Sequence, residues 1–248
     1  MKPKILLYDI EVSRDIVAGY GPTYEFKVVK TIQHQQLMCF AYKWLGDKKV
    51  SYVSRHDFPT YKKFVQFLAY LQNEADIVIA HNANRFDNKM ANRFFLKEGI
   101  PPPSPYKSID TLQVARSKFK FQSNSLRALS DFLELGEKEK ITYADLEDDF
   151  MTDKPSRKTL RLMKKYTQMD VVLLERIYLK LRPFISNHPN VADLAQSDHM
   201  CPKCQSYDVE KRGFIRTRSG QRQRYQCRGC SGWSSEATKK GNGRLVNA

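Results

Sequence analysis

The stretch from residue 5 to residue 12, Ile-Leu-Leu-Tyr-Asp-Ile-Glu-Val, constrains the fold more than any other part of this chain. Branched and aromatic residues dominate it, which favours a β-strand. Side chains alternate between the two faces of a strand, and both faces here carry apolar residues, as in a strand covered on both sides. Asp9 and Glu11 occupy successive positions on the face that also carries Ile5 and Leu7.

These two carboxylates need compensation if the strand continues to Val12. They would then lie about 7 Å apart on a partly buried face, where each loses hydration and repels the other. A divalent cation beside them would offset both effects. The alternative is a strand that ends at Tyr8, which would leave Asp9 and Glu11 in a solvated loop.

The rest of the chain alternates strand-like and helix-like segments, which predicts an α/β fold in which helices flank a mixed sheet. Residues 13–36 are polar, with turn signals at their glycines. We expect strands over 37–45, 50–53 and 76–80, and helices over 58–71, from the loop after residue 80 to 97, and from Pro155 to about Arg182. The predicted organisation is a main domain over 1–184, a linker over 185–200 and a small domain over 201–248.

Two further carboxylates stand at informative positions. Asp87 follows the strand 76–80, and open α/β sheets place their sites beyond the carboxyl ends of strands. Aspartate is also common at the start of a helix, so this position alone allows either reading. In the long helix, Met163, Asp170 and Ile177 are seven residues apart and share one apolar face. Asp170 therefore replaces an expected apolar residue, unless it lies at the edge of that face.

Three segments together resemble the three motifs of the DEDD exonuclease superfamily: Asp9-Ile10-Glu11, Asn82 with Phe86-Asp87, and Tyr166-x-x-x-Asp170. The last form is that of the tyrosine subgroup, since Lys165 stands where the histidine subgroup carries its histidine. The likeness covers about residues 4–182. Val12 departs from the pattern, because a threonine often follows the first-motif glutamate.

The resemblance implies a ribonuclease H-like fold and phosphodiester hydrolysis with two Mg²⁺ or Mn²⁺ ions. Hard oxygen ligands suit these ions, and a pair of them stabilises the attacking and leaving oxygens. Tyr166 is a poor general base, because the unperturbed pKa of tyrosine is about 10. The implied roles are Asp9 bridging both ions, Glu11 and Asp170 on the nucleophile side, Asp87 on the other ion directly or through water, Tyr166 orienting the attacking water, and Asn82 and Phe86 positioning Asp87 and the terminal nucleotides.

The C-terminal domain carries two Cys-x₂-Cys pairs, Cys201 with Cys204 and Cys227 with Cys230. Four thiolates at this spacing suit one tetrahedral Zn²⁺, and a span this short needs such a staple to fold. Disulfides are the alternative reading. Cys39 lies in an apolar strand and is expected to be a buried thiol.

The same region is strongly basic. Residues 201–248 hold 11 Lys or Arg against 3 Asp or Glu, whereas the other 200 residues hold 31 against 24. A zinc ribbon with a basic hairpin tip over 216–224 would suit phosphates and unpaired bases. The alternative is an ordinary solvated surface in which Trp233 is core. The predicted nucleic-acid contacts are Arg216, Arg218, Arg222 and Arg224.

We therefore expect a metal-dependent 3′–5′ exonuclease that acts on DNA in replication or repair, with single-stranded or frayed ends preferred. The alternatives are an RNase or a structure-selective nuclease of the same chemistry, or a non-catalytic protein that recruits a partner such as a polymerase. No apolar run approaches the roughly 20 residues of a membrane span, and the apolar N-terminal run is interrupted at Asp9. The expectation is a cytoplasmic, bacterial or phage-encoded protein without a membrane partner.

Overall fold

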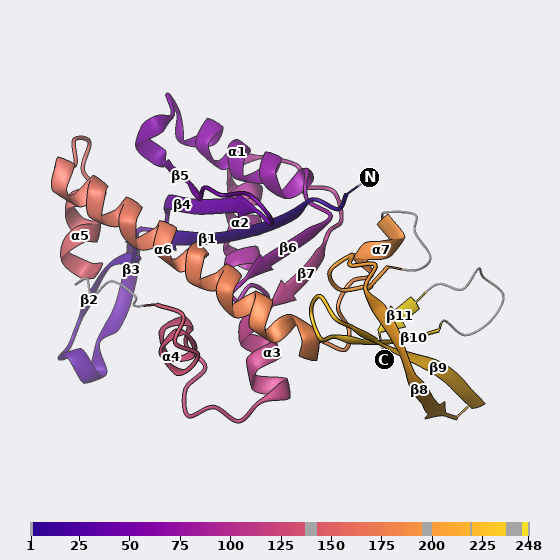
Figure 1. Cartoon of the computed structure of the whole chain (residues 1–248). Helices are drawn as coiled ribbons and strands as arrows, with labels where there is room; N and C mark the ends of the chain where they lie inside the picture. Colours follow the sequence, from indigo (N-terminus) through magenta and orange to yellow (C-terminus); the bar gives the residue numbers. More distant parts are fainter. Residues whose placement is uncertain (1, 137–142, 195–199, 219, 237–244, 248) are drawn as a thin grey trace.

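The computed structural model describes residues 2–136, 143–194, 200–218, 220–236 and 245–247. A five-stranded mixed sheet forms its centre (Figure 1). The first strand pairs antiparallel with β4 and parallel with β6. In sheet order the strands are β5 (Ser51–Ser54), β4 (Leu37–Trp44), β1 (Ile5–Val12), β6 (Ile77–Ala80) and β7 (Lys107–Asp110).

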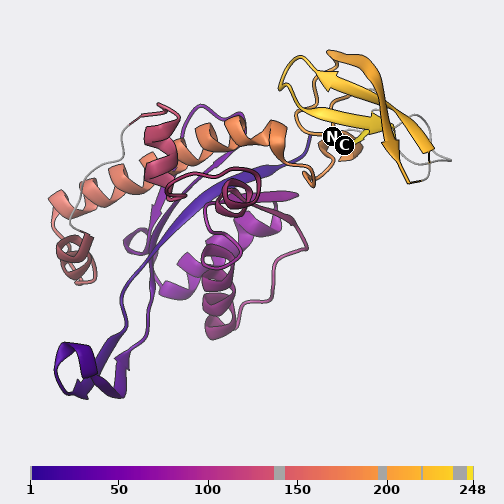
Figure 2. The same ribbon diagram turned by 90° about the horizontal axis from the view of Figure 1, so that it is seen from below.

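Helices cover both faces of this sheet, as Figures 1 and 2 show. One apolar cluster joins Leu6 and Tyr8 of β1 to Phe64 of α1 and Phe94 of α2. The other joins the opposite face of β1 to α3, α4 and α6. The helices are α1 (Tyr61–Asn73), α2 (Asp87–Glu98), α3 (Thr111–Lys118), α4 (Leu126–Phe132), α5 (Tyr143–Phe150), α6 (Arg157–Leu181) and α7 (Val191–Leu194), with short 3₁₀ turns η1 (Thr23–Glu25), η2 (Arg55–Asp57) and η3 (Arg182–Phe184).

This architecture confirms the predicted α/β class. The long helix starts slightly later than expected, because the Ser156 side chain accepts a hydrogen bond from the Thr159 backbone and so caps a helix that begins at Arg157. Pro155 lies just outside. No helix in the described part of the chain has the length and apolarity needed to cross a membrane.

Residues 13–36 differ from the expectation of a polar stretch with turns. They contain a second, two-stranded sheet, β2 (Ile16–Tyr20) paired with β3 (Lys27–Gln33), which extends away from the body (Figure 2). Every residue of β2 is exposed, and so are most of β3. A hairpin that buries neither face has no need for the period-two pattern that reveals a strand, so no such pattern marks these residues.

The C-terminal region forms a four-stranded sheet in the order β11-β10-β9-β8. The hairpin between β8 and β9 is tighter than expected, because both strands extend into the segment predicted as its tip and remain paired as far as Thr217 and Gly220. The strands are β8 (Val209–Thr217), β9 (Gly220–Cys227), β10 (Trp233–Glu236) and β11 (Leu245–Asn247).

The segment that joins the two parts packs against α6 rather than running free. His188 is buried at 3% exposure, and its Nε2 lies 2.8 Å from the Tyr178 hydroxyl. Its Nδ1 lies 2.7 Å from the Pro189 carbonyl, which can only accept, so Nδ1 carries the proton and the Tyr178 hydroxyl donates to Nε2. Burial lowers the pKa of His188 to about 4.

This buried histidine predicts acid sensitivity. Its folded pKa lies below the ordinary value of 6.5, so the unfolded chain binds the extra proton first as pH falls. The contribution of His188 to the free energy of unfolding should therefore fall by about 3 kcal/mol between pH 6.5 and pH 4. Urea unfolding at several pH values measures this. The His188→Gln variant should lose that part of the slope, whereas His34→Gln, at an exposed histidine, should keep it. Equal slopes in all three proteins would contradict the assignment.

Candidate metal centre

β1 continues to Val12, which excludes the reading in which Asp9 and Glu11 follow a strand that ends at Tyr8. Asp9 pairs with Ala41 and Glu11 with Cys39 across the β1–β4 ladder. Ile5 and Leu7 belong to the apolar cluster beneath α6. Alternation along the strand therefore directs both carboxylates toward α6.

Asp170 comes from that helix. It is 3% exposed, and its stripe neighbours Met163 and Ile177 are fully buried, so it does not lie at an exposed edge of the apolar face. One carboxylate oxygen from each of Asp9, Glu11 and Asp170 lies within 4.8 Å of the others. Three carboxylates this close repel one another, and a divalent cation with oxygen ligands relieves that repulsion. The donor set therefore fits Mg²⁺ or Mn²⁺.

Asp87 lies beside this group rather than within it. Among the described residues, the acids with carboxylate oxygens within 4.8 Å of one another are Asp9, Glu11 and Asp170. Asp87 does not belong to this group. Asp87 is the first residue of α2 and is 2% exposed. Burial raises the pKa of its carboxyl to about 7, against hydrogen bonds from its own backbone and that of Ile10. The contact with Ile10 ties Asp87 to the strand between Asp9 and Glu11.

A cavity of about 580 Å³ opens over the three acids. Tyr166 lines it from α6, one turn before Asp170, and Asn82 and Phe86 line it from the loop between β6 and α2. The structure thus brings every predicted residue of the three motifs except Asp87 to one cavity wall. The wall also contains residues that the sequence did not single out, namely His81, Arg116, Ser123 and Asn124.

Asp110 holds the Asn82 loop in place. Its carboxylate accepts from the Asn82 backbone at 3.0 Å and from the Asn84 backbone at 3.1 Å, and it also caps α3. Asn82 adopts a left-handed backbone conformation, with φ 72°. This conformation is unusual for a residue other than glycine, and the two hydrogen bonds stabilise it. No pattern in the sequence marks Asp110 as the residue that positions this loop.

His81 and Asn124 also line the cavity. The imidazole of His81 lies between two partners: its Nδ1 is 2.9 Å from the Thr111 hydroxyl, and its Nε2 is 3.0 Å from the Asn124 carbonyl. These contacts make His81 a structural link between the end of β6 and the segment before α4. Arg116 adds a positive charge to the wall, which suits a phosphate next to the acids.

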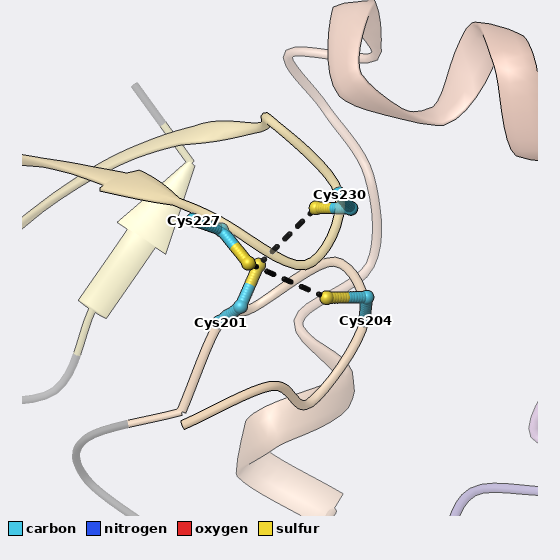
Figure 3. A group of neighbouring side chains, drawn as sticks. All are labelled: Cys201, Cys204, Cys227 and Cys230. Atoms are coloured by element: carbon cyan, nitrogen blue, oxygen red, sulfur yellow. Dashed lines mark hydrogen bonds between the residues drawn. The ribbon is translucent and has the colours of Figure 1, made fainter. Parts of the chain in front are cut away.

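The four cysteines of the C-terminal region converge (Figure 3). Their sulfurs all lie within 4.8 Å of one another, with Cys201 and Cys230 3.7 Å apart and Cys204 and Cys227 3.6 Å apart. A tetrahedral zinc site with Zn–S bonds of about 2.3 Å separates its sulfurs by about 3.8 Å. All four are free thiols, which excludes the disulfide reading in this structure. The arrangement fits a structural Zn²⁺.

The predicted arginines lie on the β8–β9 hairpin. None of these four arginines is among the described residues that line the acidic cavity. Arg224 also has a structural contact, because its guanidinium lies 4.5 Å from the centre of the Trp233 ring and its Nε donates to the Arg212 carbonyl. Cys39 is fully buried in β4, as expected, and burial raises the pKa of its thiol.

The sequence matches RNase_H_2, a family of the RNase_H superfamily, over residues 10–182. This chain belongs to the RNase H superfamily. Membership agrees with the predicted ribonuclease H-like fold and supports a nuclease. It also supports divalent metal ions at the acidic group, whereas the tyrosine subgroup remains a prediction. Among curated proteins, none matches this sequence.

One similar solved structure is the family B DNA polymerase from the hyperthermophilic archaeon Pyrobaculum calidifontis. It aligns with this RNase H superfamily member at a TM-score of 0.54 and 15% identity, over 73% of this chain. The aligned part is 25% of the polymerase, so the chain spans about a quarter of that protein's length. At this identity the likeness shows the fold.

Proposed function

We propose that this protein is a metal-dependent 3′–5′ exonuclease of the DEDD type, tyrosine subgroup, that hydrolyses DNA from single-stranded or frayed 3′ ends. The observation that carries the proposal is the convergence of Asp9, Glu11 and Asp170 within 4.8 Å, on the wall of a cavity that Tyr166 also lines. Three acids from two distant segments meet where a scissile phosphate could enter. In this proposal residues 1–184 form the catalytic domain and 201–248 a zinc ribbon, joined by 185–200.

Each motif residue has a role in the proposal. Two Mg²⁺ or Mn²⁺ ions, when bound, supply stabilisation of the attacking and leaving oxygens. Asp9 and Glu11 would hold them from β1 and Asp170 from α6, while Asp87 would act from the start of α2, directly or through water. Tyr166 orients the attacking water by hydrogen bonding. Asn82 and Phe86 contact the terminal nucleotide. Single strands are favoured as substrates because this nucleotide has to enter the cavity unpaired.

The product ladder of an end-labelled oligonucleotide tests the reaction. We expect 5′-labelled single-stranded DNA, with Mg²⁺ or Mn²⁺, to shorten one nucleotide at a time from its 3′ end. Matched RNA and blunt duplex DNA should be cut at least tenfold more slowly. Faster cutting of RNA would instead support an RNase of the same chemistry, and internal cuts at junctions would support a structure-selective nuclease. An intact substrate in every arm would contradict the enzyme and favour the non-catalytic alternative.

The ribbon arginines should contribute affinity rather than chemistry. The triple variant Arg216, Arg218 and Arg222→Ala should bind single-stranded DNA more weakly, and the slope of log K against log salt should become shallower by about 0.7 for each phosphate that is no longer neutralised. Turnover of saturating substrate should change little, because the ribbon arginines are not part of the cavity wall. Fluorescence anisotropy at several salt concentrations measures this.

A matched control removes three charges elsewhere. Lys62, Lys63 and Lys97 are exposed on α1 and α2, so their triple alanine variant changes the net charge equally. If both triple variants lose the same affinity, the effect belongs to overall charge and not to the ribbon.

A further inference from the structure

A second groove lies next to the acidic cavity, and it is lined by aromatic rings. It has a volume of about 710 Å³ and shares Ser123 with the cavity over the acids. We call it the phenylalanine groove, because its wall contains Phe119, Phe121, Phe132 and Phe184. These four residues come from the segment after α3, the end of α4 and η3.

The rings form a continuous row. Phe132 packs edge-on to Phe121 at 5.2 Å between centroids, Phe121 lies 5.3 Å from Phe119, and Phe119 packs edge-on to Phe184 at 4.9 Å. The two end members are largely exposed, Phe132 at 70% and Phe184 at 55%. Exposed aromatic surface arranged in a row is characteristic of binding sites rather than of the core.

Charge and position both indicate the occupant. Lys120 and Lys180 are exposed on the groove wall, which suits a ligand that is apolar on its faces and negative along its backbone. Ser123 lines both the groove and the acidic cavity. Phe184 of the groove follows Pro183, whose carbonyl accepts a hydrogen bond from the ammonium of Lys203, which lies between Cys201 and Cys204 in the sequence. The groove therefore adjoins the candidate catalytic cavity and has a neighbour of the C-terminal domain beside Phe184.

We infer that the phenylalanine groove binds the unpaired bases of a single-stranded nucleic acid whose 3′ end lies in the acidic cavity. This inference rests on the proposed nuclease function and extends it to the strand upstream of the cut. Bases stack on aromatic side chains irrespective of sequence, while lysines contact the phosphates. A base-paired strand has no free base faces to offer, so the groove would select single strands.

Binding of a 12-nucleotide single strand, measured by anisotropy without added Mg²⁺ or Mn²⁺ so that it stays intact, tests the groove. The double variant Phe132→Leu and Phe184→Leu keeps the apolar surface and removes two rings. Its affinity should fall roughly tenfold for each ring, whereas the variant with tryptophan at both positions should bind as well as the wild type. Affinity for a blunt duplex should change less than twofold. Unchanged single-strand affinity in the leucine variant would overturn the inference, as would equal losses for both substrates.

Two controls separate the possible failures. The double variant Tyr70→Ala and Leu96→Ala removes exposed apolar side chains from α1 and α2, at 56% and 84% exposure, and should bind normally. Cleavage of a dinucleotide, which is too short to fill the groove, shows in the wild type whether the acidic cavity is catalytic by itself. If the wild type cleaves nothing, the nuclease proposal fails, while the binding assay still measures the groove. If sedimentation shows a wild-type dimer that the leucine variant cannot form, the groove binds a second copy and the inference is overturned.

Discussion

Replacing Asp9 with alanine is expected to lower the rate of DNA cleavage by more than about 10³-fold. Asp9 lies within 4.8 Å of both other acids and is the residue proposed to contact both ions. Metal ions supply several kcal/mol of transition-state stabilisation, and each 1.36 kcal/mol corresponds to a tenfold change in rate. The Asp170→Ala variant should lose as much, although its carboxylate comes from another element. Initial rates on end-labelled single-stranded DNA measure both effects.

The same variants should remain folded. Removing one of three neighbouring carboxylates relieves their repulsion, so the metal-free melting temperature should stay equal or rise. In the wild type, Mn²⁺ at ten times its Kd should add about 1.4 kcal/mol to the free energy of unfolding, and Asp9→Ala should lose that gain. The matched control is Asp47→Ala, at an exposed aspartate after β4. Rates within a few-fold of the wild type in Asp9→Ala would refute the assigned centre.

The parts of the fold that could be predicted are those where burial forces a pattern. The first strand is covered on both faces, so it had to be apolar on both, and the two acids stood out against that background. The same holds for Asp170 in the buried stripe of α6. Two segments about 160 residues apart could be assigned to one centre because each places a carboxylate where its own period requires an apolar side chain.

The parts that could not be predicted depend on contacts between distant segments. The β2–β3 hairpin buries neither face, so it left no periodic signal. Asp110 fixes the Asn82 loop by accepting hydrogen bonds from backbone N–H groups, which every residue type except proline can donate. The four rings of the phenylalanine groove become neighbours only when α3, α4 and η3 pack around α6. The resemblance implies a role for Asp87 at the second ion, directly or through water, and only the structure shows that it is buried at the start of α2, where burial raises its pKa.

Loss of Cys204, one of the four proposed zinc ligands, is expected to unfold the ribbon. Structural zinc contributes about 10–16 kcal/mol of folding free energy in comparable small domains, and the described residues 200–218 and 220–236 have few buried apolar side chains to replace it. The Cys204→Ser variant should bind less than 0.1 zinc per chain, against one in the wild type. Protease should then cut within 200–236, while the main domain stays intact.

Unfolding of the ribbon should weaken the binding of single strands more than it slows cleavage in the acidic cavity. The ribbon contacts the main domain through a hydrogen bond from Lys203 to the Pro183 carbonyl. It contacts the linker through hydrogen bonds from the Val191 backbone to Pro202 and from Gln205 to the Val191 carbonyl. Because Pro183 precedes Phe184, loss of the ribbon should loosen the end of the phenylalanine groove and weaken the binding of single strands. The acidic cavity lies on β1 and the middle of α6, so dinucleotide cleavage should change less than about threefold.

Cys39→Ala provides the matched control, since this thiol lies in β4 and should not affect zinc content. Metal analysis, limited proteolysis and both activity assays can be run on the same two preparations. A Cys204→Ser protein that retains one zinc and resists protease would show that the four converging thiols are not a structural metal site. The ribbon would then be stabilised by its contacts with the rest of the chain alone. The Lys203→Ala variant, which removes one of these contacts, would test that explanation.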